Sequence, residues 1–409
     1  MTTAAPTRDD RRPSSGLATR FGPALAAYAF AVAMAGTTLP TPLYPTYRAE
    51  FGFSQFVVTV IFATYALGVI VGLLLFGNAS DTIGRRRALL PALLLSAVSA
   101  GVFLAASGLG LLIVGRVVSG LSAGIFTGTA TVAVVELARP ESKGRATLLA
   151  TVANIGGLGC GPLLAGLLAQ YAGHPLRLPY LVDLALLVPA VAAVLVMPET
   201  VEGARPSLRG LRPQRPTVPP EVRAVFVRGA IAGFAGFAVL GLFTAIAPSF
   251  LAEILDVHNA AAVGAVVFSV FAASTLGQLA LEKVPGDRGL VVGCGGLVVG
   301  MAVLAGGLAA SSLVLLVAGG VIAGFGQGMS FRAGLGAVTA ASPSDVRAAV
   351  ASTFFTIAYV ALALPVIGVG LSSRVVSLRT TGLVFAGGVM VLAAVAAGLL
   401  LVQRPARRG

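Results

Sequence analysis

The sequence predicts an all-α integral membrane protein with twelve transmembrane helices in two pseudo-symmetric six-helix halves. The 409 residues are 57% hydrophobic and only 11% charged, whereas soluble domains are about 45–50% apolar and about 25% charged. Twelve apolar runs are long enough to cross a bilayer, which takes about 20 residues per helix. A stretch rich in proline and arginine separates the first six runs from the last six. This composition excludes a water-soluble enzyme of ordinary surface.

The twelve runs define the expected helices and the segments between them. They cover residues 23–45, 55–78, 88–106, 109–137, 145–171, 178–197, 226–253, 260–281, 288–308, 312–338, 347–371 and 380–402. The prolines and charges of the stretch between the sixth and seventh runs leave too little apolar surface for it to fold alone. We therefore expect five parts: a tail over 1–22, a half over 23–197, a linker over 198–225, a half over 226–402 and a tail over 403–409.

Positive charge is distributed unevenly between the two sides of the predicted membrane. The tails and the alternate gaps on their side hold 22 of the 28 lysines and arginines, and the opposite side holds four. Positive residues accumulate on the cytoplasmic side of membrane proteins. We therefore expect a multi-pass protein of the cell (plasma) membrane with both termini and the linker in the cytoplasm. The net charge of +13 then reflects topology, and no nucleic-acid partner is expected.

An internal repeat supports the division into halves. The segments Pro140–Pro162 and Pro343–Pro365 both span 22 residues from proline to proline. Upstream, two glycines of the fourth run recur in the tenth run at an offset of 204 residues. Duplicated six-helix halves are an architecture of membrane transporters.

The strongest local motif is GNASDTIGRRR, residues 77–87, between the second and third runs. Its defining residues are Gly77, Asp81, Gly84, Arg85, Arg86 and Arg87. Glycines permit a tight turn, and the arginines anchor it at the headgroup boundary. The segment resembles the loop 2–3 signature of the major facilitator superfamily, and the twelve runs, two halves and central linker extend that resemblance over the chain.

The resemblance implies roles for this loop. Its family counterpart gates the change between outward-open and inward-open states. Carried over, Asp81 would cap the eleventh helix, and Arg85 would pair with an acid at the end of the fourth helix, where Glu136 lies. The second half departs from the pattern, because Leu281 stands where the aspartate is expected. Only the first gate is therefore predicted.

Arg116 lies within the fourth run, together with glycines at every fourth position, Gly120, Gly124 and Gly128. An arginine in hydrocarbon costs about 2.5 kcal/mol or more, so it is expected to face the bundle interior. The glycines form a smooth face for close helix packing. The segment is similar to the family's helix 4 signature, whose arginine is tied to proton coupling. The alternative is an arginine that extends toward the membrane surface.

The fifth run contains a glycine–proline pattern made of Gly157, Gly161, Pro162 and Gly166. Proline removes a helix hydrogen bond and bends the helix, and glycines allow backbone contact. The segment resembles the helix 5 motif of antiporters in this superfamily, although Ala165 replaces the first glycine of the final pair. The resemblance favours export over uptake. The alternative is a packing face with a bend.

Asp183 is the only carboxylate well within an apolar run. A buried carboxyl group is a candidate proton carrier, and Arg116 is placed to approach it from the same leaflet. The alternative is an interfacial aspartate open to water. Many proton-coupled exporters of the family carry an acid in the first helix, and this chain has Thr37 and Thr38 there instead.

Polar and aromatic side chains in the central parts of the helices are candidates for lining a substrate cavity. They are Tyr28, Thr38, Asn154, Ser269, Gln327, Arg332 and Tyr359. Each is equally able to hydrogen-bond a neighbouring helix. Two buried arginines against one buried acid favour neutral or anionic amphiphiles over a dedicated cation.

The sequence therefore predicts a secondary active transporter that works by alternating access, with proton-coupled efflux of a small amphiphilic compound. Proton- or ion-coupled uptake of a metabolite is the alternative, and a membrane sensor is a third possibility. We expect no enzyme activity. Gly120–Gly124 matches GxSxG, the nucleophile motif of serine hydrolases, but that chemistry needs a histidine base nearby, and both histidines of the chain are expected in loops on the opposite side of the membrane. No cofactor or metal is expected, and the partners are a small-molecule substrate, protons and the lipid bilayer around a monomer.

Overall fold

The computed structural model describes residues 16–77, 79–201, 215–284 and 288–401. Within these ranges the chain is helical and contains no strand. Twelve helical stretches have the length and apolar composition to cross a membrane. Their number and positions agree with the twelve runs, and the predicted fold class is confirmed.

The first group of helices runs from α1 to α9. Its elements are α1 (Gly16–Thr38), η1 (Thr41–Leu43), α2 (Tyr44–Phe51), α3 (Gln55–Phe76), α4 (Ala79–Ile83), α5 (Arg85–Leu104), α6 (Leu109–Glu136), η2 (Pro140–Ser142), α7 (Lys143–Thr151), the π-helical turn η3 (Val152–Gly156), α8 (Gly157–Tyr171) and α9 (Leu178–Val196). We call this group the N half.

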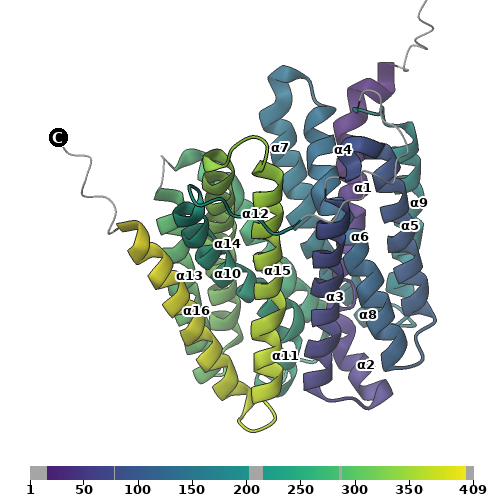
Figure 1. Cartoon of the computed structure of the whole chain (residues 1–409). Helices are drawn as coiled ribbons and strands as arrows, with labels where there is room; N and C mark the ends of the chain where they lie inside the picture. Colours follow the sequence, from purple (N-terminus) through teal and green to yellow (C-terminus); the bar gives the residue numbers. More distant parts are fainter. Residues whose placement is uncertain (1–15, 78, 202–214, 285–287, 402–409) are drawn as a thin grey trace, which may run out of the picture.

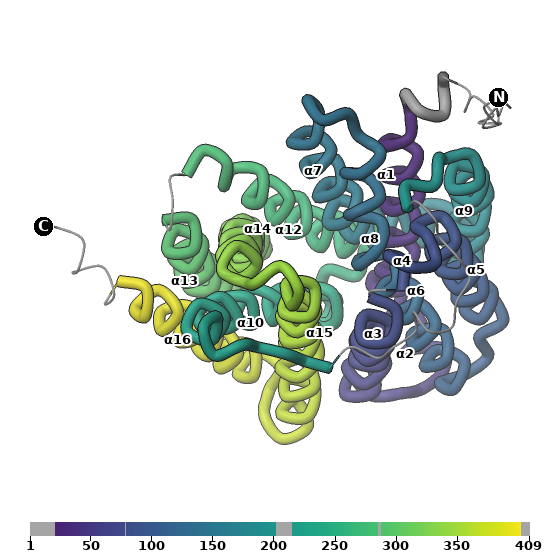
Figure 2. The backbone as a smooth tube through the Cα atoms, turned by 45° about the horizontal axis from the view of Figure 1, so that its top comes forward, coloured from purple at the N-terminus to yellow at the C-terminus, as the bar shows by residue number. Residues whose placement is uncertain are grey.

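The second group, the C half, runs from α10 to α16. Its elements are α10 (Arg223–Ala245), α11 (Ala247–Ile254), α12 (Ala260–Ala280), η5 (Leu281–Lys283), α13 (Arg288–Ala309), α14 (Leu313–Ala341), α15 (Arg347–Ser372) and α16 (Leu378–Leu401). Figures 1 and 2 show the two groups as separate bundles that meet along α3, α8, α12 and α15.

The helix ends differ in detail from the expected segment boundaries. Helix α1 already begins at Gly16, inside the predicted tail. Helix α10 begins at Arg223, inside the predicted linker, and α16 ends at Leu401. Most of the predicted linker and tails, residues 1–15, 202–214 and 402–409, lies outside the described residues.

Glycines bring α6 against α3 at backbone distance. A Cβ added to Gly120 would lie 2.9 Å from the Cα of Gly68, and one added to Gly124 would lie 2.9 Å from the Cα of Gly72. Helix α14 packs on α12 in the same manner, since a Cβ on Gly328 would lie 3.0 Å from the Cα of Ser274. Van der Waals packing of this kind replaces the hydrophobic effect between helices in lipid.

The two ends of the bundle differ in how the halves meet. Loop 77–84 lies at one end, and the short helices α2 and α11 lie at the other (Figure 1). At the α2–α11 end, two hydrogen bonds and one ion pair join described residues of the two halves. They are the ion pair Arg48–Glu253 at 3.0 Å, the Ser249 hydroxyl donating to Gln55 at 2.7 Å, and the amide of Ala260 donating to Gln170 at 2.9 Å.

Candidate functional site

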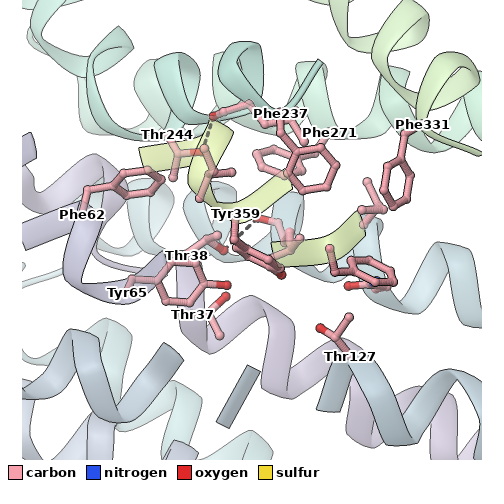
Figure 3. Close-up of a pocket in the computed structure, with 16 residues that line it drawn as sticks. Thr37, Thr38, Phe62, Tyr65, Thr127, Phe237, Thr244, Phe271, Phe331 and Tyr359 are labelled. Atoms are coloured by element: carbon pink, nitrogen blue, oxygen red, sulfur yellow. Dashed lines mark hydrogen bonds between the residues drawn. The ribbon is translucent and has the colours of Figure 1, made fainter. Parts of the chain in front are cut away.

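A cavity lies between the two halves, and the empty space in and in front of it, open solvent included, is about 590 Å³ (Figure 3). Eight of its lining residues come from the N half and eight from the C half. From the N half they are Thr37, Thr38, Phe62, Tyr65, Thr127, Asn154, Ile155 and Leu158; from the C half they are Phe237, Leu240, Thr244, Phe271, Phe331, Phe355, Tyr359 and Leu362. None of the sixteen side chains is charged.

Three of the seven predicted cavity residues line this cavity, namely Thr38, Asn154 and Tyr359. Thr38 donates to the carbonyl of Leu158 at 2.8 Å and so joins α1 to α8. Asn154 belongs to the π-helical turn η3, a distortion that is frequent at functional sites. The ring of Tyr359 meets Tyr65 of the opposite half edge-on, with centroids 6.5 Å apart.

The other four predicted residues are not among the residues that line this cavity. Tyr28 is 37% exposed and donates to the Leu186 carbonyl, so it lies on an outer face of α1. Ser269 donates to the carbonyl of Val266 in its own helix. Their polar groups gave the same sequence signal as a binding residue, although each is satisfied by nearby backbone.

Gln327 and Arg332 join α14 to α12. Gln327 accepts a hydrogen bond from Ser274 at 2.5 Å. Arg332 donates to the carbonyl of Gln278 at 2.6 Å and pairs with Glu282 at 3.0 Å. These contacts hold two helices of the C half together, and Arg332 lies near the loop-77–84 end rather than at the cavity.

Most of the cavity wall was missed by sequence reasoning. Five phenylalanines and one further tyrosine line it, and each lies in an apolar run. A phenylalanine that faces lipid and one that faces a cavity give the same signal in a sequence. The missed aromatic residues are Phe62, Tyr65, Phe237, Phe271, Phe331 and Phe355.

Arg116 is fully buried, with 0% exposure, and lies behind the cavity wall. It donates to the Tyr44 hydroxyl at 2.9 Å and to the Thr37 carbonyl at 2.5 Å. Its guanidinium carbon is 5.5 Å from the ring centre of Tyr65 and 5.9 Å from that of Phe62. It therefore faces the bundle interior, and aromatic rings that line the cavity cover its charge.

Asp183 lies on α9 and is buried, with 3% exposure. Its carboxylate packs on α1: a Cβ on Gly36 would lie 2.9 Å from Oδ2 and 3.0 Å from Oδ1. The predicted approach of Arg116 to Asp183 is corrected, because Arg116 forms its hydrogen bonds with Tyr44 and Thr37 instead. The two groups thus contact consecutive residues of α1 without an ion pair between them.

Loop 77–84 and the ends of α6 and α9 form an ionic cluster around Arg85. Arg85 donates to both carboxylate oxygens of Glu136, at 3.0 and 3.1 Å, and to Ser80 at 2.6 Å. It also pairs with Asp81. The contact between Arg85 and Glu136 that the resemblance implies is therefore present in the structure.

Asp81 does not cap the eleventh helix, which corrects the second implication of the resemblance. Its carboxylate pairs with Arg85 four residues later, and the start of α15 carries no side-chain cap. The physical reason is the arrangement of the halves, since their polar contacts lie at the opposite, α2–α11 end.

Glu199 and Thr200, just beyond α9, belong to this cluster and were missed in the sequence. The Glu199 carboxylate accepts from the backbone amides of Arg85 at 2.8 Å and Arg86 at 3.1 Å, and so caps the start of α5. Thr200 donates to Glu136 at 2.6 Å. Gly84 has φ +101°, and a Cβ there would lie 2.8 Å from the Glu199 carboxyl carbon, so only glycine fits. The sequence signal that could have pointed to Glu199 is its position as an acidic residue just after the end of a predicted helix.

The glycine–proline pattern of α8 packs against both halves. A Cβ on Gly157 would lie 3.0 Å from the Cα of Ala31 in α1, and Gly161 also faces that helix. Gly166 faces Ala260 of α12, and a Cβ on Gly264 would lie 3.0 Å from the carbonyl carbon of Pro162. The pattern is thus a packing face that joins the halves.

Within the described ranges no three His, Cys, Asp or Glu side chains gather where they could hold a metal ion. The described site is instead an uncharged, aromatic cavity at a boundary between two bundles, with one buried arginine and one buried aspartate behind its N-half wall. It is suited to binding an organic molecule between the two bundles.

Comparison with known proteins agrees with this fold. The sequence model described as Major Facilitator Superfamily matches residues 26–364. A bacterial homologue of the human lysosomal transporter Spinster, solved inward-facing and unoccupied, is similar in structure with a TM-score of 0.72 at 15% identity, over 96% of this chain and 100% of that one. The human organic anion transporter MFSD10 (TETRAN) gives a TM-score of 0.67 at 16% identity, over 93% and 99%. No curated protein sequence is significantly similar to the chain.

Proposed function

Because this chain belongs to the major facilitator superfamily, a family of transporters, we propose that it is a secondary active transporter that works by alternating access. The observation that carries the proposal is the cavity between the halves, to which each half contributes eight residues. Movement of one half against the other changes the end to which such a cavity opens. The substrate is a small amphiphilic molecule, in keeping with the uncharged lining.

The unequal contacts at the two ends support this cycle. The halves are joined by polar contacts at the α2–α11 end, so this arrangement corresponds to access from the loop-77–84 end. The distribution of positive charge supports assigning that end to the cytoplasm. In this proposal the protein lies in the plasma membrane with both termini inside. The Arg85 cluster is the proposed gate at this end, and it stabilises the arrangement in which the two halves are closed there.

Efflux coupled to inward proton movement is the proposed direction. The glycine–proline face of α8, which packs on α1 and α12, supports export through its resemblance to antiporters. Asp183 is the proposed proton carrier, because it is buried and makes neither an ion pair nor a hydrogen bond with the described residues. The proton gradient is the driving force, no cofactor is needed, and the monomer is the working unit.

Uptake of a small metabolite, coupled to protons or another ion, is the alternative. A buried arginine beside the cavity supports this alternative for an anionic metabolite. One of the similar structures is described as an organic anion transporter. At 16% identity that likeness concerns the fold alone, so the direction and the substrate charge are questions for experiment.

Proton flux in everted membrane vesicles tests the proposal. A pH-gradient dye is followed while neutral, anionic and cationic amphiphiles are added to vesicles with wild-type protein, Asp183→Asn, or the control Asp256→Asn, whose side chain is 96% exposed. We expect some compounds to collapse the gradient, and this response to be lost only in Asp183→Asn. Collapse that survives Asp183→Asn removes the proposed proton carrier. A gradient unaffected by every compound contradicts export and favours uptake.

A further inference from the structure

The two walls of the cavity differ in chemistry. Five of the eight N-half residues carry a polar group, whereas six of the eight C-half residues are Phe or Leu. The N-half polar residues are Thr37, Thr38, Tyr65, Thr127 and Asn154. A molecule that fills this cavity therefore meets hydrogen-bonding groups on one side and hydrocarbon on the other.

The cavity offers no counter-charge to a charged ligand. No lining side chain is ionisable at neutral pH, and the nearest described cation, Arg116, is covered by the rings of Phe62 and Tyr65. The hydrogen bonds of Arg116 go to Tyr44 and the Thr37 carbonyl. A ligand charge moved here from water would lose hydration without a partner, which is costly.

Thr127 supplies a hydrogen-bonding group that the protein itself does not use. Its side chain is 93% buried, with 7% exposure, it lines the cavity, and its hydroxyl has no hydrogen-bond partner. The Tyr359 hydroxyl lies near it across the cavity, but the geometry between the two groups is not that of a hydrogen bond. The other three threonines of the lining, Thr37, Thr38 and Thr244, already donate to backbone carbonyls. A buried, unsatisfied hydroxyl in a cavity is a place for a ligand's polar group.

Aromatic rings form a continuous surface on the C-half wall. The ring centres of Phe237 and Phe331 are 5.0 Å apart, those of Phe331 and Phe355 are 5.8 Å apart, and those of Phe237 and Tyr359 are 6.1 Å apart. The interplanar angles lie between 53° and 67°. Tilted and edge-on rings at these spacings favour a further aromatic ring over a saturated one.

We propose that the cavity binds an uncharged, planar aromatic molecule with one hydrogen-bonding group, oriented with that group at Thr127 and its rings against Phe237, Phe331 and Phe355. This inference rests on the proposed function for its biological meaning, since the bound molecule is then the transported substrate. It adds the charge, the shape and the orientation of that substrate. The orientation links both halves through one ligand, with polar recognition in the N half and ring contact in the C half.

A matched series of four probes tests the ligand class. 2-Naphthamide is neutral and planar, 2-naphthoate is its anionic analogue, 2-naphthamidine is its cationic analogue, and decahydronaphthalene-2-carboxamide is its saturated analogue. Binding to the purified full-length protein is measured from the ligand-dependent rise in unfolding temperature, which reports the dissociation constant. We expect 2-naphthamide to bind at least tenfold more tightly than each of the other three.

Matched variants test the orientation. Thr127→Val removes the unsatisfied hydroxyl, and Thr129→Val is its control, because the Thr129 hydroxyl is also buried and unpartnered but does not line the cavity. Phe331→Leu removes a ring of the wall, with Phe250→Leu as the control that is buried elsewhere. We expect Thr127→Val to weaken 2-naphthamide binding about three- to tenfold, the size of one neutral hydrogen bond, and both controls to leave binding unchanged.

Several results overturn the proposal. Tighter binding of 2-naphthoate or 2-naphthamidine contradicts the uncharged class, and equal losses in Thr127→Val and Thr129→Val contradict the orientation. If no probe binds while vesicles respond to other amphiphiles, this inference fails and the proposed transport function stands. If 2-naphthamide binds as expected while no compound moves protons in vesicles, the binding site stands and the proposed proton-coupled export fails.

Discussion

The N half and the C half share a packing plan but not their chemistry. In the N half, glycines of α6 meet the backbone of α3, and in the C half glycines of α14 meet α12 in the same way. At an offset of 204 residues, however, the buried Arg116 corresponds to Gly320, whose missing side chain is replaced by the ring of Phe243. The close glycine packing is present in both copies of the repeat, whereas the buried arginine is present only in the first.

The same contrast appears at the loop-77–84 end. The N half has Arg85 bound by Glu136 and Asp81, with Glu199 capping the next helix. The C half has a simpler and more exposed pair, Arg332 with Glu282. We infer that the halves have different tasks: the N half holds the larger ionic cluster and the buried charges of Arg116 and Asp183, and the C half supplies most of the apolar wall of the cavity.

The largest expected effect comes from the arginine that has no counterpart in the C half. Arg116→Lys should lower the rate of proton-coupled transport about ten- to hundredfold, because lysine does not reach both Tyr44 and the Thr37 carbonyl, and charged hydrogen bonds contribute about 1.5–3 kcal/mol each. The rate is measured in everted vesicles at equal protein levels. Arg332→Lys is the control, and an equal loss of rate in that variant would contradict the difference between the two halves.

The shared packing plan predicts equal damage in the two halves. Gly124→Ala and Gly328→Ala should each lower the free energy of unfolding by about 1–3 kcal/mol, since the added methyl group meets backbone of the neighbouring helix. Thermal unfolding of the purified protein measures the change. Gly387→Ala, with open space around it, is the control. Damage in one half alone would show that the packing is not equivalent.

Glu199 gives a smaller effect that is confined to the N half. Glu199→Gln should destabilise the start of α5 by about 1 kcal/mol, because the charged cap of the Arg85 and Arg86 amides is lost. Hydrogen exchange of these amides should then be about fivefold faster. Glu282→Gln in the C half is expected to leave this exchange unchanged, and acceleration there would argue against a local cap.

The smallest effect is expected at the contact between the halves. Arg48→Gln removes an ion pair whose side chains are 29% and 46% exposed, so it should shift the balance between arrangements by less than about 1 kcal/mol, and less at high salt. Spin labels at Tyr171→Cys in the N half and Val375→Cys in the C half, in a protein without its two native cysteines, report the distance between the halves at this end. Arg177→Gln should not change it. A salt-independent change would contradict an electrostatic contact.

The sequence predicted the helices well because hydrophobic length is the dominant constraint in a membrane. It also identified Arg116 and Asp183, since an ionisable group within an apolar run is rare. It did not predict the partners of these groups: Tyr44 precedes Arg116 by 72 residues, and only the tertiary fold brings the two together. The pairing of Arg116 with Asp183 was wrong for the same reason.

The cavity was predicted only in part, for a related reason. The sequence pointed to Thr38, Asn154 and Tyr359 because they are polar groups in apolar runs. It pointed equally to Ser269, which bonds its own helix, and to Gln327, which bonds a neighbouring helix. The phenylalanines of the C-half wall gave no signal, because ring exposure to a cavity depends on helix rotation. Glu199 was overlooked because it follows a helix directly and was assigned to the linker.

The proton flux driven by 2-naphthamide tests the division of tasks most directly. Gradient collapse in everted vesicles is measured over a series of concentrations for wild type, for Asp183→Asn in the N half and for Phe331→Leu in the C half. We predict that Asp183→Asn abolishes the response at every concentration, and that Phe331→Leu keeps the full response but needs more compound to reach it. A full response in Asp183→Asn, or an abolished one in Phe331→Leu, would contradict the account.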